Sequence, residues 1–452
     1  MQFNHPDALD LLERAGARVN RKTHLVCLPR ELVLKQIALA PSEFRMRARN
    51  PEHDVVIGGK HMVCAPVYGS PFVHDLERGR REATMEDFCN LVKLAQMTAL
   101  IHNAGGTVVE PSDLPQETRH LDMVYALIKY SDKSFIGSVM SAANARDTLD
   151  LASILFGGRQ AIEQTPAVMA LVNANSPRVY DTRMLESLLE YARARQPVLV
   201  TPFSMAGAMS PAAVGGTLVQ INAEVLAGIT LAELASPGTP VVYGAFLMTT
   251  DMQSASPGLG TPETAAGHFV CAQLAWRYHL PFSAGGALTC SKLPDAQAMY
   301  ESMMSLWPTF LAGTHFVLHA AGWLEAGLVA SYEKFVLDVE MVQMMQAFVQ
   351  GISLDAEGLA LDAFEEVGPG EHYLGAAHTM RHYRDAFYRP LVADWSNFDD
   401  WEKAGAQPAE ARATEIWKTW LGEYEPPALD PGIDEALCEY IAKRKRALLS
   451  RA

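Results

Sequence analysis

The central part of the chain alternates short apolar segments with longer segments of helical periodicity. The short segments are rich in Val, Ile, Phe or Thr and most follow Gly or Pro, which is typical of β-strands. Helix start signals lie between them: Thr84 with Asp87 resembles a capping box, and Thr261 precedes a Pro at a first helical position. The strands predicted in this way are Met62–Val67, Thr107–Glu110, Phe135–Met140, Val168–Asn173, Val198–Thr201, Val241–Ala245, Phe282–Gly285 and His315–His319.

Strands that alternate with helices pair in parallel through crossover helices. Eight such strands over roughly residues 60–330 are what a (β/α)8 TIM barrel requires. An open doubly wound sheet is the alternative, but it normally carries a GxGxxG turn after its first strand, and the sequence has none. We therefore predict an α/β fold: an N-terminal helical and extended cap over the barrel at residues 1–50, a (β/α)8 TIM barrel at 51–335 and a C-terminal helical extension at 336–452.

Tryptophans concentrate in the predicted C-terminal extension. Large aromatic side chains of this kind pack helices onto a core or cover an interface between subunits. We expect them to hold the extension on the barrel or on a second subunit, so a homo-oligomer is predicted. The residues concerned are Trp395, Trp401, Trp417 and Trp420.

Charge and composition exclude several classes of partner. The net charge of −15 and the absence of a long Lys/Arg-rich run disfavour nucleic acid. The six cysteines form no CxxC pair, so neither a zinc knuckle nor a disulfide framework is predicted, and no metal site is assigned. The N-terminal residues carry acids early, and no apolar stretch approaches the ~20 residues of a membrane span. We expect a cytoplasmic protein without a membrane partner.

In a (β/α)8 barrel the functional groups lie at the carboxyl ends of the strands. The predicted strand ends are mainly aromatic, Phe203 among them, with one carboxylate and one imidazole and no cluster of Lys or Arg. Aromatic faces with a carboxylate suit a cationic ligand, particularly a quaternary ammonium, whereas a phosphorylated substrate is disfavoured. No catalytic residue is assigned. The residues predicted to line the substrate site are Tyr68, Glu110, Phe246, Gly285, Gly286, His319 and Trp323.

His315 and His319 are four residues apart, a spacing that could hold one zinc ion on a helix. On a strand the same spacing separates them by about 13 Å, too far to share a metal, and the β-rich flanks favour the strand. His315 is then a structural histidine, while His319 at the mouth either binds a substrate carboxylate or packs in the core. Lys292 and Cys290 have no partner motif, which favours a solvated charge and an unreactive thiol.

Three stretches resemble the trimethylamine methyltransferase superfamily: residues 48–59 (ARNPEHDVVIGG), 66–75 (PVYGSPFVHD) and 291–301 (SKLPDAQAMYE). The similarity extends from about residue 5 to 445; Cys290 departs from it, because many relatives carry an acid there. The resemblance implies a barrel that moves a methyl group from a methylated amine to the cobalt of a separate corrinoid protein, in one-carbon metabolism related to methanogenesis. The cobalamin belongs to that partner, and no tightly bound cofactor is expected.

The trimethylamine enzymes of this superfamily carry pyrrolysine, whereas this chain is written in the ordinary twenty residues. It therefore resembles the non-pyrrolysine branch, whose substrates are quaternary amines such as glycine betaine. When a quaternary ammonium loses a methyl group, the leaving group is a neutral amine. The enzyme therefore needs only to orient one methyl group and exclude water. We expect Tyr68, Phe246 and Trp323 to form a modest aromatic box. His319 and the Gly285–Gly286 backbone would hold a carboxylate, and Glu110 would either line the cation side or be structural.

Two other functions stay open at this point. One is a quaternary-amine-binding protein without transfer activity. The other is a methyltransferase that uses tetrahydrofolate as the acceptor, in which acid and amide groups such as Glu110, Asn173 and Asn175 would pair with the pterin ring.

Overall fold

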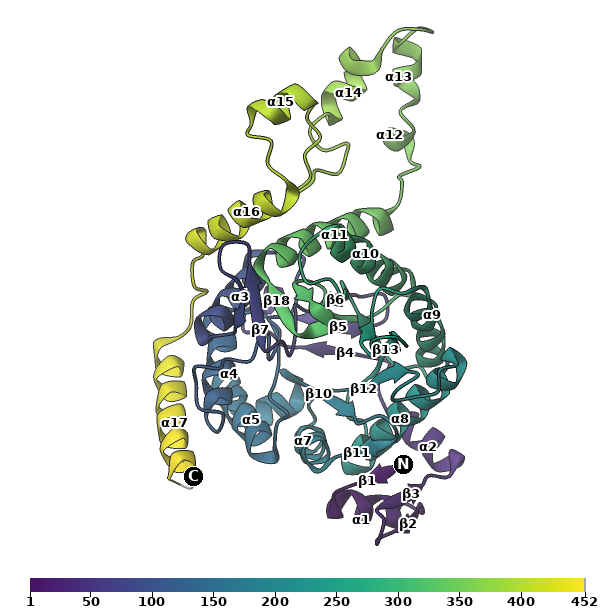
Figure 1. Ribbon diagram of the computed structural model, residues 1–452, viewed down its shortest axis with the longest axis vertical. Helices are drawn as coiled ribbons and strands as arrows, with labels where there is room; N and C mark the ends of the chain where they lie inside the picture. The colour runs from purple at the N-terminus through teal and green to yellow at the C-terminus, as the bar shows by residue number, and fades with distance from the viewer. Residues whose placement is uncertain (451–452) are drawn as a thin grey trace.

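The computed structural model describes residues 1–450, and its core is a curled parallel sheet surrounded by helices and smaller sheets (Figure 1). The short strand β14 (Pro257–Gly258) pairs with one of its strands in antiparallel fashion. This mixed α/β architecture confirms the predicted class. In spatial order the parallel strands are β6 (Val63–Cys64), β16 (Phe316–Leu318), β15 (Phe282–Gly285), β13 (Val241–Thr250), β12 (Val198–Ala206), β10 (Val168–Ala174) and β9 (Phe135–Ile136).

The strand predicted at Thr107–Glu110 is wrong. Gly105 has a φ of +90°, and the Val108 N–H donates to the Gly106 carbonyl at 2.9 Å, so the chain turns here instead of extending. Val108 and Val109 are nevertheless fully buried, which explains the apolar pattern that suggested a strand. Slightly earlier in the chain, Asn103 forms an isolated parallel bridge with Ser134, just before β9. The other predicted strands are found at their predicted positions.

Helices surround the sheet, and two predicted start signals are confirmed. Thr84 and Asp87 form a complete capping box at the first of these helices, and the Thr261 side chain accepts a hydrogen bond from the Thr264 N–H at 3.4 Å. The surrounding helices are α3 (Met85–Met97), α4 (Arg119–Tyr130), α5 (Ala142–Phe156), α6 (Arg159–Gln164), α7 (Thr182–Arg193), α8 (Val214–Ala235), α9 (Pro262–Arg277), α10 (Ala296–Leu311) and α11 (Tyr332–Gln350).

By length and composition α8 could cross a membrane, and it is the one such helix within residues 1–450. Most of its apolar stretch is buried inside the protein, where it packs against β12 and β13. Its composition is therefore explained by its place in the core of the fold.

The interior of the curled sheet is closed at one end by a hairpin of β4 (Glu43–Met46) and β5 (Val55–Gly58). Phe44 and Ile57 of the hairpin join the cluster of buried side chains that fills the sheet's interior. The Arg47 N–H donates to the Pro166 carbonyl at 2.7 Å, just before β10 begins. The hairpin thus covers the amino ends of the strands and leaves the carboxyl ends, where the substrate site is predicted, uncovered by it.

Residues 1–37 lie beside the curled sheet, while β4, which also falls within the predicted N-terminal cap at residues 1–50, closes one end of it; the cap and its bounds stay a prediction. The strands β1 (Gln2–Phe3), β2 (Arg18–Asn20) and β3 (Leu25–Cys27) form a small sheet in which β1 pairs in parallel with β11 (Val179–Tyr180). The helices α1 (Pro6–Arg14) and α2 (Arg30–Ile37) pack against α8. This pairing with a segment downstream of β10 holds the N-terminus at the side of the molecule (Figure 1).

Another small sheet lies at the carboxyl ends of the strands and carries Trp323. Its order is β17 (Trp323–Leu324), β18 (Val329–Ser331), β7 (Phe72–Asp75) and β8 (Gly79–Glu82). In this sheet β7, which follows β6 in the chain, pairs with β18, which follows β16. This sheet therefore ties together two distant parts of the chain next to the predicted site.

After α11 the chain leaves the body of the molecule as an arm, residues 351–403, which projects away from the curled sheet (Figure 1). The arm holds α12 (Ala356–Leu359), α13 (Leu361–Glu366), α14 (Ala377–His382) and α15 (Phe398–Lys403), and the chain returns through α16 (Ala409–Glu423) and α17 (Pro431–Leu449). Trp417 of α16 is buried and its Nε1 donates to Glu333 at 2.9 Å, as expected for a residue that packs the extension onto the core. Trp395 is 68% exposed.

Candidate substrate site

Four ring side chains from the carboxyl ends of the strands form one contiguous cluster. Phe203 and Phe246 lie opposite each other on β12 and β13 and stack with ring centroids 5.7 Å apart. The ring of Phe246 also lies roughly perpendicular to those of His319 and Trp323, with centroids 5.7 Å apart in each pair. His319 and Trp323 stack at 4.4 Å. The structure thus brings together the predicted residues Phe246, His319 and Trp323, with Phe203 beside them.

The backbone between His319 and Trp323 is held in an unusual conformation. His319 has a φ of +59°, in a region that non-glycine residues rarely adopt, and Gly322 has a φ of +98°. The Gly322 N–H donates to Asp338 Oδ2 at 2.8 Å, and Asp338 forms an ion pair with Lys334, both fully buried in α11. The ion pair of α11 therefore anchors the loop that presents the two site rings.

Two buried nitrogens in this cluster have no hydrogen-bond partner within residues 1–450: His319 Nδ1 and Trp323 Nε1. A buried polar atom without a partner costs free energy, about 1–3 kcal/mol, and such atoms are rare in native proteins. Burial lowers the pKa of His319 to about 3, so its imidazole is neutral at ordinary pH. A neutral imidazole can still donate one N–H. The cluster thus offers aromatic faces together with two unpaired nitrogens: Trp323 Nε1 carries a proton, and His319 Nδ1 donates or accepts according to the tautomer.

Tyr68 follows β6 and packs against the interior cluster of the sheet. A Cβ on Gly106 would lie 2.9 Å from Tyr68 Cε2, so glycine is needed there to admit the ring. Burial raises the pKa of Tyr68 to about 12, which keeps its phenol protonated. In the described part of the chain, Tyr68 makes no ring contact with Phe246, His319 or Trp323.

Glu110 lies near Tyr68, at a cavity of about 230 Å³ that it lines with Thr107, Arg119 and Asn144. Its carboxylate forms an ion pair with Arg119 at 2.8 Å. The guanidinium therefore balances the charge that Glu110 would offer to a cationic substrate. Its place on the cation side of the site stays a prediction.

Gly285 and Gly286 serve close packing in this structure. The Gly286 N–H donates to the Leu318 carbonyl at 2.7 Å, and a Cβ on Gly286 would lie 2.6 Å from Ala320 Cα. A Cβ on Gly285 would lie 2.5 Å from Leu288 Cδ1. Gly286 allows the end of β15 to approach the chain around His319, and Gly285 leaves room for the Leu288 side chain. The role of both glycines in binding a carboxylate stays a prediction.

His315 is a structural histidine, as predicted. Its Nδ1 accepts from the Phe282 N–H at 2.9 Å, and its Nε2 lies 3.3 Å from the Gly59 carbonyl. Cys290 donates from Sγ to the Pro257 carbonyl at 3.1 Å, and burial raises the pKa of its thiol, which is the opposite of what a thiolate nucleophile needs. Lys292 donates to the Cys290 carbonyl at 2.9 Å at the protein surface.

Sequence reasoning missed the supporting ion pair of Lys334 and Asp338. Its signal is an i, i+4 pair of opposite charges within an otherwise apolar helix, a pattern that usually marks a solvated helix face. Only the fold shows that both charges are buried beneath the site.

A curled parallel α/β sheet with an aromatic and partly polar site at its carboxyl ends defines an α/β protein with a small-molecule site. The chain belongs to the trimethylamine methyltransferase (MTTB) family, whose model matches residues 1–448. This confirms the resemblance in the sequence.

Known proteins similar to this chain support the same assignment. A glycine betaine methyltransferase of Desulfitobacterium hafniense is 44% identical over 98% of this chain and 92% of its own length. The trimethylamine methyltransferase MttB of another strain of that species is 31% identical over 97% of this chain and 88% of its own length. The crystal structure of the Methanosarcina barkeri monomethylamine methyltransferase (MtmB) matches with a TM-score of 0.50 and 11% identity, covering 94% of this chain and 93% of its own. That last likeness concerns the fold alone.

Proposed function

We propose that this protein transfers a methyl group from a quaternary amine, glycine betaine or a close relative, to Co(I) of a separate corrinoid protein. The observation that carries the proposal is the cluster of Phe203, Phe246, His319 and Trp323 with its two unsatisfied buried nitrogens. The cluster suits a ligand that has both a trimethylammonium head and a hydrogen-bond acceptor. The 44% identity with a glycine betaine methyltransferase over nearly the whole chain supports the same substrate class.

The proposed reaction requires little acid or base catalysis. The methyl C–N bond breaks, its electron pair stays on nitrogen, and the electron pair of Co(I) forms the new bond to carbon. Because the nitrogen begins with a positive charge, the leaving group is a neutral tertiary amine. Catalysis then comes mainly from orientation, for which effective molarity supplies at most about 7–11 kcal/mol.

The site residues orient the substrate. Phe246 and Trp323 place aromatic faces against the cationic head, an attraction of about 0.5–2 kcal/mol. The positive charge on nitrogen fades in the transition state, so a stronger cage would stabilise the bound substrate and slow the reaction. His319 donates its N–H to the carboxylate of a betaine, and Tyr68 and Glu110 complete the wall of the site.

We also propose that residues 102–105 supply the eighth strand of a closed (β/α)8 barrel. In support, the N–H groups of His102 and Asn103 donate to the Cys64 carbonyl of β6 at 2.8 and 3.2 Å. On the other side, the Ala104 N–H donates to the Ser134 carbonyl at 2.8 Å and the Gly105 carbonyl accepts from Ile136 of β9 at 2.7 Å. A closed barrel would arrange all the strand ends around one mouth, which the corrin face of the partner protein can approach.

The proposal includes the partners and the surroundings of the reaction. The corrinoid protein carries the cobalamin, and this chain holds no cofactor tightly. The protein works in the cytoplasm. It forms a homo-oligomer, because the arm exposes many large apolar side chains that a second copy would cover.

Methyl transfer can be tested directly by mixing the purified protein with glycine betaine and Co(I) cobalamin and following the absorption spectrum. We expect the spectrum of methylcobalamin to develop. Trp323→Leu should slow it, whereas the same change at Trp276, which is 50% exposed on α9, should not. No spectral change with any quaternary amine, with either free cobalamin or a cognate corrinoid protein, would contradict the proposal. Calorimetric titration with tetrahydrofolate and with cobalamin separates the two acceptors, and betaine binding without transfer would identify a binding protein.

A further inference from the structure

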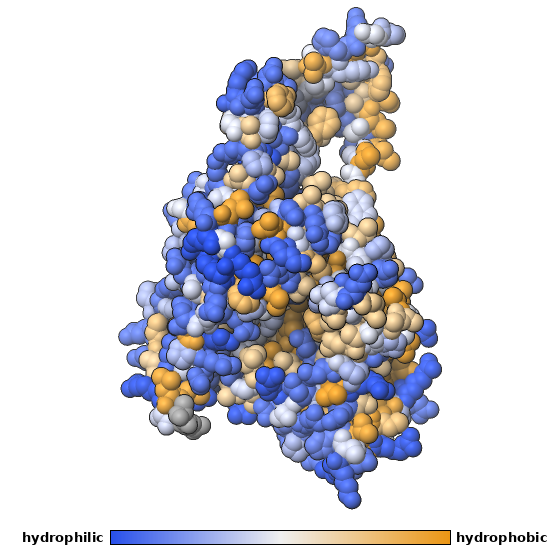
Figure 2. All heavy atoms as spheres, viewed as in Figure 1, coloured by the Kyte–Doolittle hydropathy of each residue, from blue (hydrophilic) through white to orange (hydrophobic). Residues whose placement is uncertain are grey.

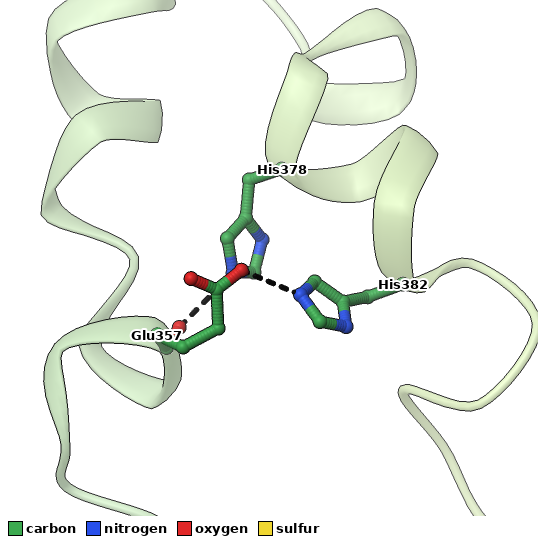
Figure 3. A group of neighbouring side chains, drawn as sticks. All are labelled: Glu357, His378 and His382. Atoms are coloured by element: carbon green, nitrogen blue, oxygen red, sulfur yellow. Dashed lines mark hydrogen bonds and ion pairs between the residues drawn. The ribbon is translucent and has the colours of Figure 1, made fainter.

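A second group of convergent side chains lies in the arm, outside the substrate site. His378 and His382 are four residues apart on α14, and Glu357 lies on α12 (Figure 3). One ligand atom from each residue lies within 4.8 Å of the other two. His382 Nε2 is 2.7 Å from Glu357 Oε1, and His378 Nε2 is 3.9 Å from the same oxygen. Residues distant in the sequence therefore present two imidazoles and a carboxylate to one point.

This donor set is characteristic of zinc. Two histidines at i and i+4 on a helix with one carboxylate form a common three-residue zinc site, in which water occupies the fourth position. Zinc binds these atoms at about 2.0–2.2 Å, which brings neighbouring ligand atoms to roughly 3.3–3.5 Å from one another. The separations in the arm are within reach of that geometry after small side-chain rotations. Asp385 Oδ1 lies 4.0 Å from His382 Nδ1, where it could orient the imidazole from behind.

The group already attracts a cation. Arg381 places its guanidinium 3.1 Å from Glu357 Oε1 and 3.5 Å from Asp362 Oδ2. The Arg381 side chain is half exposed and can stay on Asp362 when Glu357 takes another partner. His378 Nε2 donates to the Glu357 carbonyl at 3.0 Å, so this nitrogen must give up its proton and this hydrogen bond before it can hold a metal ion. A metal ion would thus replace Arg381 at the carboxylate.

The arm also lacks the buried core that would hold its short helices together. Of the residues in α12, α13 and α14, only Ala363 is buried. Phe364 of α13 is 65% exposed, and Leu374 and Phe387 elsewhere in the arm are 77% and 84% exposed. Hydrophobic residues lie open on the surface of the arm (Figure 2). Isolated helices shorter than about 12–15 residues are marginal in water, and α12 and α14 are much shorter. Metal binding contributes folding free energy directly to small elements of this kind.

We propose that Glu357, His378 and His382 bind one zinc ion that joins α12 to α14 and fixes the conformation of the arm. The site is structural, and no step of the proposed methyl transfer uses it. No metal site is predicted from the sequence. His378 and His382 lie more than twenty residues after Glu357, and only the fold of the arm brings the three together.

The test uses the full-length protein, treated with a chelator and then titrated with Zn²⁺ by calorimetry. We expect one zinc ion per chain from the wild type, and a loss of affinity of at least tenfold in His378→Ala and His382→Ala. His372→Ala is the matched control, because His372 is an exposed histidine of the same arm outside the group. Substitution with Co²⁺ should give visible absorption bands of a four-coordinate site in the wild type and the control only.

A second measurement is limited proteolysis, in which each protein is compared with and without Zn²⁺. The effect of Zn²⁺ then depends neither on differences in folding between the variants nor on methyl transfer. Zn²⁺ should slow tryptic cleavage after Arg381 and Arg384 severalfold in the wild type and in His372→Ala, and have no effect in His378→Ala or His382→Ala. Wild-type protein that binds no zinc, or variants that bind it as tightly as the wild type, would overturn the proposal.

Discussion

Burial determines what His319 can do for a substrate. Because its pKa is lowered to about 3, the imidazole carries no charge near neutral pH and cannot form an ion pair with a carboxylate. It can donate one hydrogen bond, and a bond to a charged acceptor is worth more than one between neutral groups. A neutral imidazole also places no second positive charge beside the cationic head of the substrate. It therefore does not repel that head from the aromatic faces of Phe246 and Trp323.

We expect His319→Ala to weaken binding of carboxylated quaternary amines by about 1.5–3 kcal/mol, the range for a lost hydrogen bond to a charged group. Choline has no carboxylate, so its binding should be nearly unchanged. Calorimetry with glycine betaine and choline on the same variant measures both values. Equal losses for the two ligands would show that His319 does not contact the carboxylate.

The depressed pKa of His319 also predicts a pH dependence of stability. The unfolded chain takes up this proton near pH 6.5, but the folded protein does so only near pH 3. Stability from the neutral imidazole is therefore complete above about pH 6.5 and falls as the pH drops toward 3. Between pH 6.5 and 5, the free energy of unfolding should fall by about 1.6 kcal/mol more in the wild type than in His319→Gln.

Urea unfolding of both proteins at several pH values measures this difference. Other buried groups, such as His268 and Glu233, titrate in both proteins, so their contributions cancel in the comparison. Parallel pH profiles for the two proteins would show that His319 titrates normally.

At the scale of elements, the substrate site depends on α11. The fully buried pair of Lys334 and Asp338 holds the Gly322 N–H and with it the loop between β16 and β17. Glu333, next to the pair, accepts hydrogen bonds from Trp417 and from Thr414 of α16, each at 2.9 Å. One helix therefore supports the site on one side and the C-terminal extension on the other.

We expect Asp338→Asn to lower the free energy of unfolding by about 3–5 kcal/mol, because it leaves the Lys334 ammonium buried without a counter-charge. The double variant Lys334→Met with Asp338→Leu removes both charges and should recover most of that loss. Denaturant unfolding compares the variants, with Asp399→Asn in the exposed part of the arm as the control. A loss below about 1 kcal/mol in the single variant would mean that the Lys334 charge is solvated or absent.

Strands and helix caps could be predicted from the sequence because local patterns determine them. The capping box of Thr84 and Asp87 needs only two residues three apart, and runs such as Val168–Asn173 are apolar on both faces because both faces are buried. The segment around Val108 misled the prediction because burial in a turn leaves the same apolar pattern as burial in a strand. Strand ends identified Phe246, His319 and Trp323, but their mutual contacts and the group of Glu357, His378 and His382 depend on tertiary structure.

At the scale of the whole molecule, the two ends of the curled sheet have different roles. The hairpin of β4 and β5 fills the amino ends, while the aromatic cluster and the sheet of β17, β18, β7 and β8 occupy the carboxyl ends. With the proposed site at the carboxyl ends, stability and function would be separated along the axis of the sheet, as they are in (β/α)8 barrels. The arm belongs to neither end, and its exposed apolar side chains need another explanation.

We expect the arm to be covered by a second copy of the chain. An apolar groove of about 610 Å³ lies where the arm meets the body, lined by Met303, Met304, Trp307 and Met344. Two copies related by a twofold axis could bury both surfaces, because each would present its arm and its groove to the other. Light scattering should give at least twice the monomer mass for the wild type, and Phe387→Asp with Leu374→Asp should shift it toward the monomer. Val219→Asp, a change at a residue 71% exposed on α8, should leave the mass unchanged. A wild-type protein that is monomeric at micromolar concentration would contradict this prediction.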